Sequence, residues 1–173
     1  MAGEIKLNSV NFASESGGTI TVNNGTLGSG VVFPAGTIIK VSYGLNDTAS
    51  ASLSGTQTSL SLGITTKVAN SNFLIIASGN ASLGTASSGR LFLTKTISAT
   101  ETEVGDFGNV YFNNANAVQG FTGMWTLSPS LTASAALTLK VKVAVDSGTF
   151  RYNVDWINSS NNAQTSITVF EYM

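Results

Sequence analysis

Hydrophobic and polar residues alternate over several stretches of this chain. The clearest is residues 137–145, where LTLKVKVAV places five apolar residues on one side of an extended backbone and Thr138, Lys140 and Lys142 on the other. Successive side chains of a β-strand point to opposite faces of its sheet, so this period of two is typical of a strand that buries one face. A second β-rich stretch, ITVFEY, covers residues 167–172. The pattern therefore predicts a protein built from strands.

From Val31 onward, short apolar stretches are separated by turn residues. Ser54-Gly55, Ser78-Gly79-Asn80 and Ser147-Gly148 indicate reversals, because Gly and Asn adopt the positive φ angles that many turns require. Residues 94–119 carry no strong period and are expected to form a long loop with one short strand. No amphipathic helix is indicated. The expected strands cover residues 38–43, 59–64, 73–78, 90–96, 110–112, 121–127, 137–145, 150–157 and 167–172.

This arrangement predicts an all-β fold in which residues 31–173 form a single jelly-roll or β-sandwich domain. Residues 1–30 differ, because their few apolar positions lie among Gly and Asn turn signals and are too sparse to form a core. We interpret this segment as an extended N-terminal arm that docks on a partner. A strand added to the main sheet is an equally good interpretation. The apolar residues expected to dock are Ile5, Leu7, Val10, Phe12, Ile20 and Val22.

The composition limits the chemistry of the chain. It contains no Cys and no His, so Ser-His-Asp and Cys-His nucleophile systems and thiolate zinc sites are excluded. Charged residues make up only 10% of the chain and its net charge is −1, which argues against nucleic acid as a partner. No apolar run is long enough for membrane insertion, and the N-terminus lacks the apolar region of a signal peptide. We expect a protein that is not an enzyme and needs no cofactor.

Glu101, Glu103 and Asp106 are close together in the sequence and could hold a hard cation such as calcium through their oxygen atoms. Their spacing matches no EF-hand, and carboxylates are common in exposed connections. A solvated acidic loop is therefore the preferred interpretation, with a cation site as the alternative.

The strand at residues 167–172 is apolar on both faces. Ile167 and Val169 share one face, and Phe170 and Tyr172 lie on the other. Such a strand is either central in the sandwich or packed against a neighbouring subunit. The four residues are our candidates for a subunit interface.

Four segments suggest a family: residues 1–26 (MAGEIKLNSVNFASESGGTITVNNGT), 32–37 (VFPAGT), 73–80 (FLIIASGN) and 166–172 (SITVFEY). In these four segments the chain resembles fibre or head-decoration proteins of aquatic tailed bacteriophages. The resemblance implies a homotrimer of jelly rolls, similar to the C1q and tumour-necrosis-factor heads, attached to the particle by its N-terminal segment.

Under this resemblance the protein is expected on the virion surface, made in the host cytoplasm without a signal peptide. Its partners would be further copies of itself and a major capsid protein or tail component. About thirty residues precede the head, which favours a capsid decoration or head knob over a long fibre. The alternative is a tail-fibre adhesin that contacts host surface polysaccharide. Exposure of Tyr43, Tyr111 or Trp125 would favour it, because aromatic rings pack on sugars.

Overall fold

The computed structural model describes residues 4–7, 10–16, 19–22, 35–50, 52–83, 87–112, 118–154 and 163–173 of the 173-residue chain. For the strands before residue 23, and for residues 83, 87 and 109–112, it describes the backbone alone. The chain divides into two compact units, Met1–Phe33 and Pro34–Met173. The described residues contain no helix that could cross a membrane.

The first unit contains a small antiparallel sheet with the order β1-β2-β3. Its strands are β1 (Glu4–Leu7), β2 (Val10–Ser16) and β3 (Thr19–Val22). The six apolar residues expected to dock lie on these strands, whose backbones pair with one another. Docking of this segment on a particle stays a prediction.

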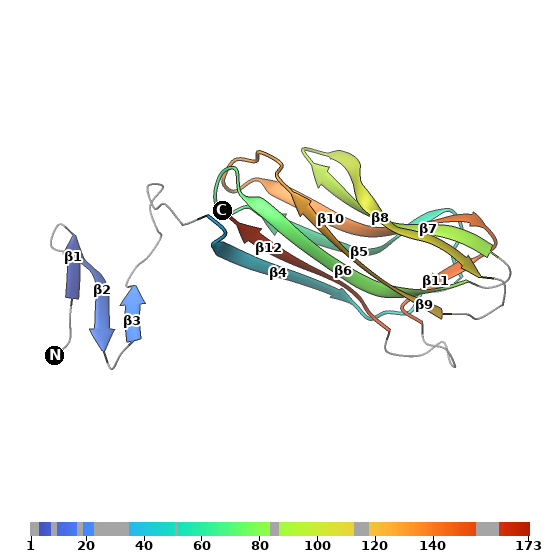
Figure 1. The fold of residues 1–173 in the computed structure, drawn as a ribbon, viewed down its shortest axis with the longest axis horizontal. Coiled ribbons are helices and arrows are strands. Elements are labelled where there is room, and N and C mark those ends of the chain that lie inside the picture. Colours follow the sequence, from blue (N-terminus) through green and yellow to red (C-terminus); the bar gives the residue numbers. More distant parts are fainter. Residues whose placement is uncertain are drawn as a thin grey trace. The chain divides into compact units, whose positions relative to one another are not determined.

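The second unit is a sandwich of two antiparallel sheets (Figure 1), which confirms the predicted all-β fold. One sheet has the order β5-β10-β7-β8. In the other, β4 pairs with β12, β12 with β6, and β6 also with β9 and β11. The strands are β4 (Ile38–Asn46), β5 (Thr56–Thr65), β6 (Asn72–Leu83), β7 (Ser87–Ile97), β8 (Thr100–Phe112), β9 (Val118–Leu127), β10 (Ala136–Ser147), β11 (Phe150–Tyr152) and β12 (Thr165–Tyr172).

The core lies between the two sheets and follows the alternation of the sequence. Leu137, Leu139, Val141 and Val143 on β10 are all completely buried, as the period of two predicts. From the other sheet they meet inward-facing residues of β6 and β12, among them Phe73, Ile75, Ala77, Ile167 and Val169.

The expectation of a long loop over residues 94–119 is wrong, because β8 is a full strand paired along β7. The β7–β8 pairing shifts register twice, and the β8 residues left unpaired at these shifts are Val104 and Phe107. Both are apolar and pack against the core. Each bulge reverses which residues face inward, so the strand loses the period of two that would reveal it.

The turn expected at Ser78-Gly79-Asn80 is also wrong, since β6 continues through these residues to Leu83. Gly79 serves close packing here. A Cβ at this position would lie 2.5 Å from Cζ of Phe121 on β9 and 2.9 Å from Oγ1 of Thr165. Glycine in a strand can mark such a close approach as well as a reversal.

Side chains close the two open sides of the sandwich. On one side β4 caps the edge of β5, because Asn46 Nδ2 donates to the carbonyl of Ser59 at 2.6 Å and Lys40 Nζ to that of Thr65 at 2.7 Å. On the other side, the Phe107 ring makes edge contacts with Phe121 and Trp125, with centroids 4.7 and 4.8 Å apart. At the β5 edge, polar side chains of β4 take the place of a further hydrogen-bonded strand.

Candidate functional site

β12 lies between β4 and β6 and pairs with both, so it is a central strand of its sheet. Ile167 and Val169 point into the sandwich and are 0% and 1% exposed, so they are core residues of their own subunit. Phe170 and Tyr172 point away from the core and are half-buried. Of the four candidates for a subunit interface, the outward-facing pair is the one that a partner can reach.

The register of the four strands arranges the outward-facing side chains in rows. One row runs Thr126, Leu74, Phe170, Val41, and the next runs Met124, Ile76, Thr168, Tyr43. Side chains opposite each other on neighbouring strands lie within contact distance. The rows thus form a continuous surface, here called the outer apolar face, whose apolar members are Ile38, Val41, Tyr43, Leu45, Leu74, Ile76, Met124, Phe170 and Tyr172.

The edge strands of this face are the most exposed. Among the side chains that the structure describes, five large hydrophobic ones are exposed, and all five belong to the outer apolar face. A single exposed apolar residue is ordinary, whereas a contiguous group marks an interaction surface. The five are Ile38 at 56%, Val41 at 54%, Tyr43 at 59% and Leu45 at 41% on β4, and Met124 at 67% on β9.

β4 reverses the usual arrangement of a half-buried strand, in which the apolar side chains face the core. Val41, Tyr43 and Leu45 point outward, whereas the residues between them, Ser42 and Gly44, are half-buried toward β5. A Cβ at Gly44 would lie 3.3 Å from Cδ1 of Leu62, so glycine lets β4 pack closely on β5. Exposing the apolar side of a strand breaks the agreement between sequence pattern and fold, and functional surfaces are where such conflicts occur.

A groove of about 550 Å³ runs across the outer apolar face. Its wall includes Gly36, where the chain enters β4 with a φ of +83°. Gly36 N–H donates to the carbonyl of Met173 at 2.5 Å, which ties the end of β12 to this entry. No charged residue lines the groove, so it suits an apolar side chain. The lining residues are Gly36, Ile38, Leu74, Ile76, Thr126, Phe170 and Tyr172.

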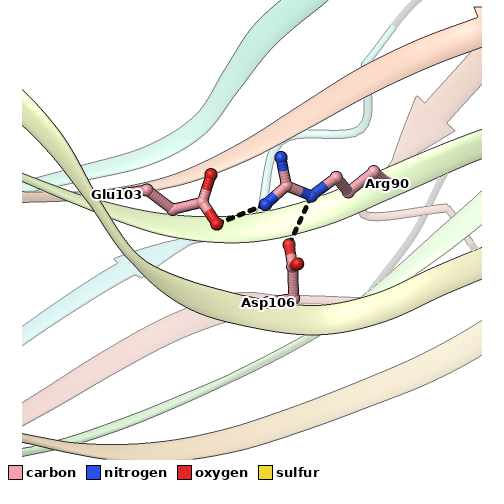
Figure 2. A network of polar contacts seen from close by, with 3 residues as sticks. All are labelled: Arg90, Glu103 and Asp106. Atoms are coloured by element: carbon pink, nitrogen blue, oxygen red, sulfur yellow. Dashed lines mark hydrogen bonds and ion pairs between the residues drawn. The ribbon is translucent and has the colours of Figure 1, made fainter.

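The outward side of the other sheet is charged. The Arg90 guanidinium on β7 bonds to two β8 carboxylates, those of Glu103 and, at 2.5 Å, Asp106 (Figure 2). Glu101 accepts from Lys140 Nζ at 2.6 Å and Lys142 Nζ at 2.7 Å. These two lysines hold the pKa of Glu101 at about 2, below its ordinary value. The sandwich thus has one charged and one apolar outer side.

The three carboxylates considered as a cation site therefore lie on a strand, and all three are paired with basic side chains. The described residues contain no group of three or more acidic, His or Cys side chains arranged to hold a metal. The solvated acidic loop is wrong as well, because β8 continues through these residues. They fasten an edge strand to the sheet.

The aromatic residues considered for sugar binding have different environments. Tyr43 is exposed, with apolar Val41 and Leu45 as its outward neighbours along β4. Trp125 is half-buried against the core and Phe107. The side chain of Tyr111 lies outside the described residues.

Neither a protein-family model nor a curated protein matches this sequence. Among solved structures, an Eiger TNF from S. frugiperda is 8% identical with a TM-score of 0.42, over 79% of this chain and 94% of that one. A structure of infectious bursal disease virus, Gx strain, is 10% identical with a TM-score of 0.42, over 88% of this chain and 43% of that one. The globular domain of zebrafish complement 1qA is 13% identical with a TM-score of 0.31, over 64% and 68%. The fold assignment rests on the strand order of the sandwich itself.

Proposed function

We propose that this protein is a non-enzymatic structural component of a virion surface, and that its sandwich assembles with further copies of the chain through the outer apolar face. The observation that carries the proposed self-assembly is the orientation of β4, which presents Val41, Tyr43 and Leu45 to solvent. The charged outer side of the opposite sheet suits continued contact with water.

The free energy gained by burying the outer apolar face is large enough to contribute substantially to association. Burying a large apolar side chain completely contributes roughly 1.5–3 kcal/mol. Covering five that are about half exposed contributes several kcal/mol per subunit, before the half-buried groove residues are counted. Association costs about 4–15 kcal/mol in lost freedom of motion, and a ring in which every copy contributes two surfaces can offset this.

The trimeric state and the virion location follow from the sequence resemblance. The N-terminal segment, with strands β1 to β3, would dock on a major capsid protein or tail component. Three linked copies of that segment would bind the particle more tightly than one, because the second and third contacts form at high effective concentration. A capsid decoration or head knob is the preferred location.

Cryo-electron microscopy of the virus that encodes this chain tests the location. We expect knobs on the capsid or tail in which residues 1–30 contact a particle protein. Absence of the chain from the purified particle would overturn the virion assignment.

A tail-fibre adhesin is the second candidate, and the exposed ring of Tyr43 is the observation that favours it. Sugar sites combine an aromatic platform with polar groups that fix orientation, whereas Val41 and Leu45 beside Tyr43 are apolar. Isothermal titration with host-envelope glycans separates the two candidates. A binding isotherm that Tyr43→Ala abolishes would favour the adhesin.

A further inference from the structure

The outer apolar face carries an exposed methionine, Met124, on one edge strand and a groove beside it. The lining of the groove comes mainly from the inner strands β6 and β12 together with the start of β4. On the opposite edge strand, β9, Met124 is the most exposed of the five large hydrophobic side chains. Its outward neighbours on the strand, Thr122 and Thr126, are polar and smaller. Met124 therefore forms a single apolar projection on that edge.

Met124 does not fill the groove of its own subunit, because 67% of it is exposed even though it lies opposite Ile76 of the groove wall. Methionine is unbranched and polarizable, and it adapts to irregular apolar cavities. The groove carries no charged side chain, so a neutral thioether is a compatible occupant.

We propose that Met124 of one copy seats in the groove of the next copy, with Ile38 among the residues that it meets. This inference rests on the proposed self-assembly. The occupant is a second copy because projection and groove both belong to the one face that collects all five exposed large hydrophobic side chains of the described residues. Projection and groove are different sites, so two copies can exchange Met124 reciprocally in a two-fold dimer, or each copy can bind the next head to tail, which closes into a ring when the rotation permits. The trimer that we propose is the smallest head-to-tail ring.

The absence of cysteine from the chain allows a direct test with two introduced cysteines, Met124→Cys and Ile38→Cys. Strands β9 and β4 are three strand spacings apart in the sheet, so positions 124 and 38 of one chain are separated by about 14 Å or more. A disulfide needs Cα atoms within about 7 Å, so these two cysteines can be joined only between copies. Under mild oxidation we expect disulfide-linked multimers that end at the ring size.

The matched control joins Met124→Cys with Lys142→Cys, which lies on the charged outer side of the other sheet. It should give no linked multimers under the same oxidation. If the control pair forms disulfide-linked multimers as efficiently as the test pair, the links arise from random collision and the proposal is overturned.

A second variant measures the contact without cysteine chemistry. Met124→Glu places a carboxylate where the groove offers no partner, and burying it unpaired is unfavourable. We expect the dissociation constant of the oligomer to rise at least about tenfold by sedimentation. Thr122→Glu, on the same strand and side but outside the apolar rows, is its control and should change the constant much less.

The outcomes separate the two levels of the proposal. A monomeric wild-type chain would overturn self-assembly and this inference together. An oligomeric wild type whose cysteine pair does not link and whose Met124→Glu variant still assembles would overturn the Met124 contact alone. If Met124→Glu does not fold, the cysteine pair decides.

Discussion

Phe170 of β12 lies directly opposite Val41 of β4 on the outward side of the sheet, while the next pair, Glu171 and Lys40, faces the other way. An apolar pair on the outside and a charged pair on the inside is the reverse of what a solvent-facing sheet ordinarily shows. The reversal is consistent along β4, where the polar side chains bond to the edge of β5 and the apolar ones are left to a partner.

Two nearby residues of β12 should therefore respond differently to truncation. Ile167→Ala removes core atoms and should lower the free energy of unfolding by about 2–5 kcal/mol. Phe170→Ala, at a half-buried outward position, should lower it less and weaken association more. Urea unfolding and sedimentation measure the two effects. Equal responses in both assays would contradict the assignment of inner and outer faces.

Tyr43→Lys should abolish association while leaving the fold intact. The ring is 59% exposed, and surface substitutions of this kind usually change stability by less than about 0.5 kcal/mol. A lysine on the outer apolar face would have to be desolvated in the assembly. Size-exclusion chromatography with light scattering should show the monomer, and circular dichroism an unchanged spectrum. The control is Gln57→Lys, at an exposed position of β5 in the other sheet, which should keep the oligomer.

Glu171 is a buried carboxylate whose Oε1 accepts from the backbone N–H of Lys67 at 2.7 Å and of Val68 at 3.3 Å, and from the Ser71 hydroxyl at 2.7 Å. It thereby fastens the connection between β5 and β6. Hydrogen bonds to a charged group contribute about 1.5–3 kcal/mol each, so Glu171→Ala should be strongly destabilising. Ser71→Ala removes one donor and should cost less. Denaturant midpoints of the two variants test this order.

The Glu101 ion pairs should make stability depend on pH in a defined window. The carboxyl has a pKa of about 2 in the folded chain, below its ordinary value of 4.5, so the unfolded state binds its proton first as pH falls. This contribution is fully present above about pH 4.5 and is lost as pH falls to about 2. In Glu101→Gln the difference from wild type should shrink across that window. A difference independent of pH would contradict the pairing with Lys140 and Lys142.

Much of the fold could be predicted because strands such as β10 and β12 keep their period of two. β8 could not, since its bulges at Val104 and Phe107 disrupt the alternation. Gly79 has the sequence pattern of a turn although it lies within β6, because close packing and chain reversal both select glycine.

The site was harder to predict than the strands. Alternation divides the side chains of a strand between two faces but does not indicate which of the two faces the core. The pattern at Val41, Tyr43 and Leu45 is therefore the same as that of buried residues. The same ambiguity placed Ile167 and Val169 among the interface candidates. Only the packing of the second sheet against one side of β12 decides which residues point outward.

The most direct test of the central claim is the mass of the unmodified 173-residue chain in solution, measured by sedimentation velocity from low to high micromolar concentration. The proposed trimer, assembled through the outer apolar face, predicts a species with three times the 17.8 kDa of the monomer. A single species of 17.8 kDa at every concentration would contradict it.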